Sequence, residues 1–187
     1  TNGYQPVVVT NTTIGNPIGL FYGYKTDGIF KDQTVLNNAP LQFGQAVGTG
    51  AGETALGDVK YVDVNGDGKI DANDKTFIGN PHPKFTYGFT NNFKYKNVDL
   101  SIFFYGSQGG DVLNWISRRI DDPRSSGNLH QNTANYAKIG YVDGNSGNND
   151  IWNRYVLPGA DPDQVRLGVQ DPNRNSAVST RFIEDGS

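Results

Sequence analysis

The chain has 187 residues, of which 35% are apolar, 24 are glycine, 10 are tyrosine and 10 are phenylalanine. Its formal net charge is −3 and it has no basic run, so nucleic acid is not expected as a partner. The lack of cysteine excludes disulfides and thiolate chemistry, and the aromatic fraction of 12% with abundant glycine is typical of β structure with long polar loops. The chain also lacks methionine, and we interpret it as a piece of a longer protein.

The first predicted elements are short strands joined by polar loops. Residues 18–30 are aromatic-rich and predict a strand that leads into a glycine-containing turn. Residues 31–58 are polar and glycine-rich. Within them, residues 48–52 could be mistaken for a phosphate cradle, but they follow no buried strand, so we interpret them as a loop. Residues 59–62 predict a short strand.

A cation-binding pattern occupies residues 63–74. Oxygen-bearing side chains stand at its first, third, fifth, ninth and twelfth positions, and glycine stands at the sixth. This is the spacing with which a short loop wraps a hard divalent cation, with a backbone carbonyl as the ligand at the seventh position. Four crowded carboxylates would repel one another without a cation. The predicted calcium ligands are Asp63, Asn65, Asp67, Lys69 through its carbonyl, Asp71 directly or through water, and Asp74.

The residues after this loop indicate a structural site and not a sensor. An EF-hand loop would be followed by an amphipathic helix, whereas residues 75–83 contain two prolines and a Gly-Asn pair that cannot continue one. Aspartate at the twelfth position resembles the loops of dockerin modules, but those modules carry two loops with helices. We therefore expect calcium to staple a turn between β elements; the alternative is a solvated acidic turn.

The strongest fold signal lies in residues 84–106. From 84 to 95 the odd positions are mostly aromatic and the even positions are mostly polar. After a tight turn at Lys96 and Asn97, alternation resumes through residue 105. The pattern predicts a hairpin of two strands, each long enough to cross a bilayer at a tilt. A soluble β-sandwich hairpin, packed on a second sheet, fits the pattern about equally well.

Residues 109–180 are predicted to be mostly loop. Asp111 to Ile120 could form one short amphipathic helix with Val112, Trp115, Ile116 and Ile120 on one side. Loops of this length in a compact domain are uncommon, and they usually bind something or are the exposed loops of a fragment.

Several short motifs, in this order, resemble SusC/RagA-type TonB-linked outer-membrane transporters. They lie at residues 15–19, 21–24, 27–30, 57–63, 78–81, 83–89, 99–104 and 181–187. The resemblance covers most of the chain, and residues 121–179 match no such pattern. It implies an all-β fold of antiparallel strands: a fragment, residues 1–187, of the C-terminal part of a large β-barrel with long extracellular loops.

The resemblance also implies function, location and partners. Such transporters sit in the bacterial outer membrane and import glycans or peptides, powered by the TonB complex, with a SusD-like surface lipoprotein capping the barrel. The turn at residues 96–97 would then be periplasmic, and the calcium loop (63–74) and the long loop (109–180) extracellular. TonB would act through parts absent from this chain, and the barrel strands would contact outer-membrane lipid.

Substrate contact and catalysis are the remaining functional questions. The candidate substrate-binding residues are Trp115, Trp152, Arg154 and Tyr155, because aromatic faces stack on sugar rings and arginine binds hydroxyls or carboxylates. The alternative is that the aromatics pack against the barrel rim or a capping protein. No enzyme is predicted. Asp121 with Asp122, or Asp143 with Asp150, could supply the two carboxylates of a glycosidase, but they lie among Gly, Ser and Asn, as in solvated loops. The competing function is a soluble, calcium-stabilised β-sandwich that binds carbohydrate.

Overall fold

The computed structural model describes residues 8–48, 52–122, 129, 131–148, 150–159, 164–167 and 170–187. Strands dominate and helices are short, which confirms the all-β prediction. The strands are β1 (Thr10–Asn11), β2 (Leu20–Gly23), β3 (Thr26–Ile29), β4 (Leu41–Gln42), β5 (Val59–Tyr61), β6 (Lys69–Ile70), β7 (Thr76–Gly79), β8 (Phe85–Tyr95), β9 (Val98–Gln108), β10 (Asp111–Leu113), β11 (Ile139–Tyr141), β12 (Arg154–Val156) and β13 (Ile183–Asp185). The helices are α1 (Gln33–Asn37) and α2 (Ser117–Ile120), with 3₁₀ turns η1 (Ala72–Asp74), η2 (Gln131–Asn135), η3 (Ile151–Asn153) and η4 (Thr180–Phe182).

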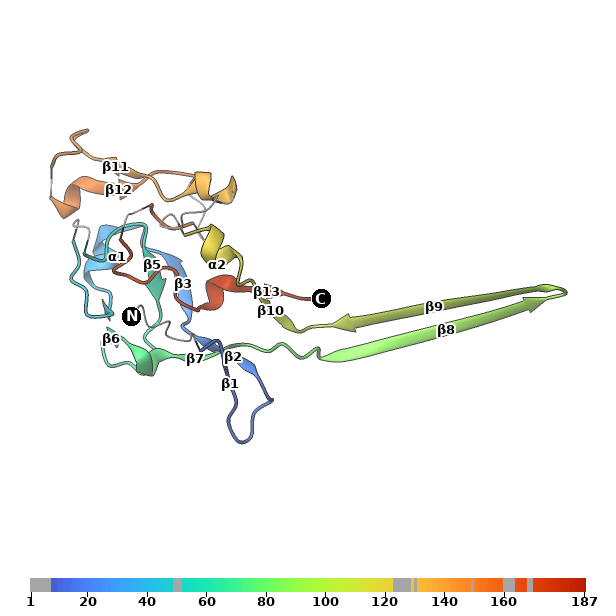
Figure 1. The fold of residues 1–187 in the computed structure, drawn as a ribbon. Coiled ribbons are helices and arrows are strands. Elements are labelled where there is room, and N and C mark those ends of the chain that lie inside the picture. Colours follow the sequence, from blue (N-terminus) through green and yellow to red (C-terminus); the bar gives the residue numbers. More distant parts are fainter. Residues whose placement is uncertain are drawn as a thin grey trace, which may run out of the picture.

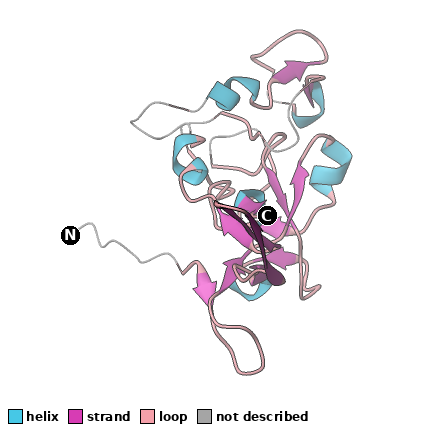
Figure 2. Cartoon of the chain, turned by 90° about the vertical axis from the view of Figure 1, so that its right-hand side faces the viewer, coloured by secondary structure: helices cyan, strands magenta, loops and turns pink. Residues whose placement is uncertain are grey.

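Small sheets form a compact body from which one long hairpin projects (Figure 1). In the body, β2 lies between β1 and β7, and antiparallel pairs are formed by β3 with β5, β10 with β13 and β11 with β12. β4 and β6 pair in parallel. Figure 2 looks along the hairpin and shows the short helices placed around these sheets. Among the described helices, none has the length and apolar character needed to cross a membrane.

The projecting element is the predicted hairpin. β8 and β9 pair without interruption from Phe85↔Gln108 to Tyr95↔Val98, so β9 extends two residues beyond the predicted end of the hairpin at residue 106. Lys96 adopts a positive φ of 51° in the two-residue turn, a conformation typical of tight hairpin connections. The alternation and the turn are both confirmed.

The core lies in the body, in two apolar clusters. The first contains Tyr24, Ile29, Val59, Tyr61 and Ile70, and it is joined by Ala137 and Val165 from the second half of the chain. The second contains Phe30, Leu36 and Leu56. Leu36 reaches this cluster from α1, where the Asp32 carboxylate caps the helix by accepting from the backbone N–H groups of Thr34 and Val35.

Three sequence predictions need correction. Residues 18–30 form two strands instead of one, because the chain stops pairing with β7 after Gly23 and pairs next with Ser179 and then with β5. The helix predicted from Asp111 to Ile120 is wrong over its first half, since β10 hydrogen-bonds to β13 and only Ser117–Ile120 is helical.

The third correction concerns the predicted loops. Residues 31–58 contain α1 and β4, and of the glycine-rich segment 48–52, residues 49–51 lie outside the described part. The segment 109–180 contains the two-stranded ribbon of β11 and β12, here called the β11–β12 ribbon. Its strands are too short for alternation to be visible in the sequence.

Candidate functional sites

The Asp63–Asp74 loop folds around its first and last carboxylates. Asp63 accepts from the backbone N–H groups of Gly66 and Gly68, at 2.6 and 2.8 Å. Gly66 and Gly68 have φ angles of +76° and +80°, which side-chain-bearing residues rarely adopt. The sharp turn predicted at the sixth position of the loop is therefore present.

Asp74 closes the loop from inside the protein. It is fully buried, and its two oxygens accept from the backbone N–H groups of Val64 at 3.0 Å and of Asp71 at 2.8 Å. The Asp71 side chain accepts from the Asn73 N–H at 2.7 Å, and Asp71 and Asp74 together form a capping box for the 3₁₀ turn η1. A single turn thus replaces the helix of an EF-hand, and β7 follows directly.

Hydrogen bonds in this loop favour the ionised form of the Asp63 carboxylate. Desolvation acts to raise the pKa of Asp63, but hydrogen bonds from the backbone N–H groups of Gly68, Gly66 and Asp67 outweigh it and hold that pKa below its ordinary value. Within the described chain, Asp63, Asp67, Asp71 and Asp74 have no Lys or Arg partner at ion-pair distance. The four charges are therefore uncompensated by protein cations.

The oxygen atoms of this loop are of the type that calcium binds, but several of the side chains accept hydrogen bonds from the backbone. Hard oxygen ligands in this order are the set that calcium prefers. Asn65 and Asp67 accept from the N–H groups of Asp67 and Lys69, at 2.9 Å each. Among the described residues, no group of three or more acidic, His or Cys side chains is arranged to hold a metal ion by itself. The calcium ligand set, which includes Asn65 and the Lys69 carbonyl, therefore stays a prediction.

The β8–β9 hairpin has one apolar and one mainly polar face. The register places the odd residues of β8 beside the even residues of β9. The apolar face consists of Phe85, Tyr87, Phe89, Asn91, Phe93, Tyr95, Val98, Leu100, Ile102 and Phe104, together with Gly106 and Gln108 at the base of β9. The opposite face consists of Thr86, Gly88, Thr90, Asn92, Lys94, Asp99, Ser101, Phe103, Tyr105 and Ser107. Most of these apolar side chains are more than half exposed, so this face is covered by nothing in the described chain.

Two features hold the hairpin in shape and direction. The Tyr87 ring lies over Gly106, where a Cβ would come within 2.3 Å of it, and the Phe89 and Phe104 rings lie 6.4 Å apart. At the base, Asn80 and Asp111 are joined by two hydrogen bonds: the Asn80 N–H donates to the Asp111 carboxylate at 2.6 Å, and the Asp111 N–H donates to the Asn80 carbonyl at 2.7 Å. The hairpin is therefore tied to the body where β7 and β10 meet.

The predicted substrate residues fall into two places. Trp115 lies just before α2, where the Arg118 guanidinium lies 4.6 Å from its ring centroid. Trp152, Arg154 and Tyr155 all belong to η3 and the β11–β12 ribbon. Trp152 is 56% exposed, so its ring is available to a ligand.

Arg154 and Tyr155 face opposite sides of the ribbon. The Arg154 guanidinium lies 5.6 Å from the Tyr141 ring centroid, and its side chain lines a cavity of about 20 Å³ that also touches Leu56 and Ile139. Tyr155 lies on the outer side across Gly140. Trp152 in η3 and Tyr155 in β12 are thus both exposed, whereas Arg154 lies on the opposite side of the ribbon from Tyr155.

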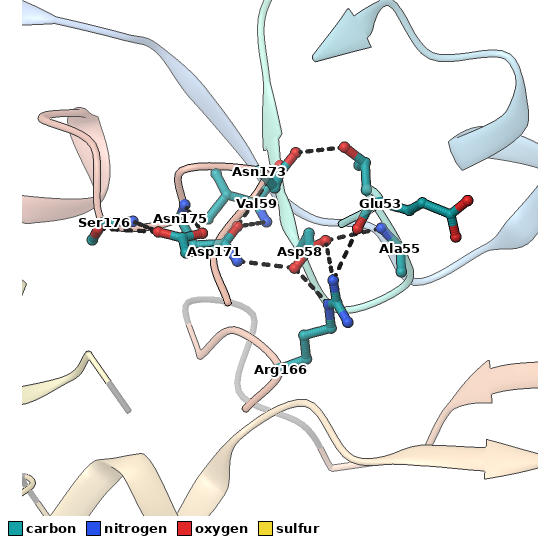
Figure 3. Close-up of polar contacts among 10 residues, drawn as sticks. Glu53, Ala55, Asp58, Val59, Arg166, Asp171, Asn173, Asn175 and Ser176 are labelled. Carbon is teal, nitrogen blue, oxygen red and sulfur yellow. Dashed lines mark hydrogen bonds and ion pairs between the residues drawn. The ribbon is translucent and has the colours of Figure 1, made fainter. Parts of the chain in front are cut away.

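A buried polar network that the sequence did not reveal joins the two halves of the body (Figure 3). Asp58, 1% exposed, accepts from Arg166 Nε at 2.7 Å and Nη2 at 3.0 Å. It also accepts from the Ala55 N–H and from Asn175 Nδ2, at 2.9 Å each. Because Arg166 and Asn175 lie more than 100 residues from Asp58, no local pattern in the sequence could have identified them as its partners.

Asn173 and Asp171 extend this network through the same C-terminal segment. Asn173 Nδ2 donates to the Val59 carbonyl at 2.9 Å, while its Oδ1 accepts from Thr54 Oγ1 at 3.1 Å. Asp171 accepts from the N–H groups of Asn175 and Ser176. The network thereby fixes residues 171–176 against the start of β5.

Three proteins of Formosa agariphila are similar to this chain. TonB-dependent receptor P3 is 37% identical over 173 residues, which is 92% of this chain and 14% of that receptor. TonB-dependent receptor P26 is 30% identical over 178 residues, 95% of this chain and 15% of that receptor. TonB-dependent receptor P39 is 44% identical over 57 residues, 30% of this chain and 6% of that receptor. No protein-family model matches the chain.

An all-β chain that aligns along nine-tenths of its length with receptors much longer than itself is a receptor segment. It belongs to the TonB-dependent receptors, as its motifs indicated. The chain spans 14% and 15% of the lengths of receptors P3 and P26.

Proposed function

We propose that this chain supplies two neighbouring wall strands and part of the outer loops of a TonB-dependent importer in the bacterial outer membrane. The observation that carries the proposal is the two-faced β8–β9 hairpin, with its apolar face uncovered. Its strands have 11 residues each. At roughly 3.4 Å per residue and a tilt of about 45°, such a strand spans about 26 Å, close to the height of the apolar band of outer-membrane barrels.

The orientation follows from the two ends of the hairpin. One end is the two-residue turn at Lys96 and Asn97, and the other joins the loop-rich body. Outer-membrane barrels have short periplasmic turns and long extracellular loops. The turn is therefore assigned to the periplasm, and the Asp63–Asp74 loop and residues 109–180 to the cell exterior.

A matched pair of substitutions in the intact receptor tests the lipid-facing assignment. Phe89→Arg places a charge on the apolar face and Thr90→Arg places one on the opposite face of the same strand. An arginine facing lipid at mid-membrane costs about 2–4 kcal/mol, whereas a lumen-facing one costs little. The folded, heat-modifiable receptor in outer membranes should fall for Phe89→Arg only. Equal tolerance of both, with a receptor that is soluble without detergent, would support the β-sandwich alternative.

We also propose that calcium neutralises the Asp63–Asp74 loop and holds this outer segment rigid. Its support is the uncompensated charge of four carboxylates and the glycine turn at the sixth position. Asp67→Asn should weaken calcium binding by the receptor, measured by calorimetry, and chelation should speed proteolysis between residues 60 and 80. Asp99→Asn, an exposed carboxylate outside the loop, is the control. Absence of calcium from the purified receptor and unchanged proteolysis would favour a solvated acidic turn.

The transported nutrient and the partners complete the proposal. The exposed aromatics Trp115, Trp152 and Tyr155 on the outer side would contact an oligosaccharide or peptide, or a SusD-like surface lipoprotein that caps the barrel. Energy would come from TonB, which would act on parts of the receptor outside this chain. Growth on a candidate glycan that requires both this receptor and TonB would support import, and binding without TonB-dependent uptake would argue against it.

A further inference from the structure

The outer face of the β11–β12 ribbon has an aromatic platform. On the inner face, Ile139 and Val156 pack against the core. On the outer face the Tyr155 ring crosses its partner strand over Gly140, where a Cβ would come within 2.6 Å of Tyr155 Cζ. A side chain at position 140 would therefore displace the ring from its place over the backbone. Tyr155 is 42% exposed, so the other side of the ring faces solvent.

A recess of about 110 Å³ adjoins this platform. It is lined by Ala134, Asn135, Tyr136, Lys138, Leu157, Pro158 and Gly159. The Leu157 N–H donates to the Lys138 carbonyl at 2.9 Å, so the pairing of the ribbon continues to these two residues. Since side chains alternate along a strand, Leu157 and Lys138 share the outer face with Tyr155. Leu157, which lines the recess, lies two residues beyond Tyr155, about 7 Å along the strand.

The chemistry of the recess favours an anionic, ring-shaped ligand. Lys138 is exposed and lies 5.5 Å from the Tyr136 ring centroid. Among the described residues it has no carboxylate at ion-pair distance, so its positive charge is available. Asn135 adds an amide that can both donate and accept. A flat apolar face beside a cation and an amide is what a sugar ring with a charged substituent requires.

We propose that the recess and Tyr155 form a subsite for one acidic sugar of a glycan. The sugar ring stacks on Tyr155, and its carboxylate or sulfate group lies against Lys138. This inference rests on the proposed import of a nutrient, and it defines the class of that nutrient as an anionic oligosaccharide.

Binding by the intact receptor in detergent tests the subsite. The probes are oligogalacturonates and sulfated galactan oligosaccharides, each beside its methyl-esterified or desulfated counterpart. At least one acidic probe should bind more tightly than its neutral counterpart. Lys138→Gln should weaken that binding about tenfold and remove the preference for charge, because a charge-assisted contact is lost. Lys31→Gln, at another exposed lysine, should leave the affinity unchanged.

Substitutions at the platform separate a binding role from a structural one. Tyr155→Phe keeps the ring and should keep the affinity, whereas Tyr155→Ala and Gly140→Val, which remove or displace the ring, should lower it several-fold. The subsite would be overturned if the receptor bound only neutral probes, if it bound no acidic probe, or if Lys138→Gln left the affinity unchanged. TonB-dependent import of a neutral glycan by this receptor would leave the proposed importer function intact. Membrane assembly of Phe89→Arg compared with Thr90→Arg tests the importer function alone.

Discussion

Replacing Arg166 should release the C-terminal segment from the body. Asp58 is almost completely buried, and Arg166 supplies two of its four hydrogen bonds. In Arg166→Met the carboxylate would keep only the Ala55 N–H and the Asn175 amide. Removing one partner of a buried ion pair typically costs about 3–5 kcal/mol, because the remaining charge is left buried and uncompensated. Arg166 also donates to the Glu53 carbonyl at 3.1 Å, and this contact would be lost as well.

Hydrogen exchange in the intact receptor measures this loss locally. A loss of about 3 kcal/mol should speed exchange in peptides covering residues 53–60 and 164–178 by about 150-fold, since each 1.36 kcal/mol is a factor of ten. Exchange in the β8–β9 hairpin should not change. Arg119→Met, at an exposed arginine of α2, is the control. Asp58→Asn added to Arg166→Met should restore part of the protection, because the uncompensated charge is gone. Less than a fivefold change, or additive effects of the two substitutions, would refute the argument that this pair closes the body.

Three further outcomes follow from the described contacts. Leu36→Ala removes a fully buried side chain from the second core cluster and should destabilise the body by about 2–5 kcal/mol, visible as a lower midpoint in denaturant. Gly68→Ala forces a side chain into φ +80° and should cost the loop about 1–2 kcal/mol, visible as faster proteolysis near residue 68. The pKa of Asp63 is held below its ordinary value of 3.8. The stability that the ionised Asp63 gives to the loop is therefore complete above pH 3.8 and is lost as the pH falls below that value. Proteolysis of the loop by pepsin across that range measures the loss, and equal protection of the loop throughout would contradict the prediction.

Features encoded by neighbouring residues could be predicted from the sequence. The hairpin was visible because alternation over 11 residues is a local signal, and its two-residue turn fixes the register. The Asp63–Asp74 loop was visible because glycine at the sixth position and the spacing of oxygens are local too. In both cases the structure depends on contacts within one continuous segment of the chain.

Features that depend on distant partners could not be predicted. From the sequence alone, Asp111–Leu113 resembles the start of a helix, whereas in the structure it pairs as a strand with Ile183–Asp185. Asp58 resembles any loop aspartate until Arg166 reaches it from 108 residues away. The two faces of the β11–β12 ribbon likewise depend on which side packs against the core, so Arg154 and Tyr155, adjacent in sequence, serve different surfaces.

The free edges of the hairpin add a separate argument for a larger sheet. Within the described chain, β8 and β9 pair only with each other, so each strand has an outer edge of 11 residues with unpaired backbone groups. A two-stranded hairpin is marginal in water, and in lipid each unsatisfied backbone group costs several kcal/mol. The two hydrogen bonds between Asn80 and Asp111 nevertheless hold the base of the hairpin to the body, so that both free edges project from it in the same direction. A hairpin held in this way is suited to receive a strand on each side, which is the position of two neighbouring strands inside a barrel wall.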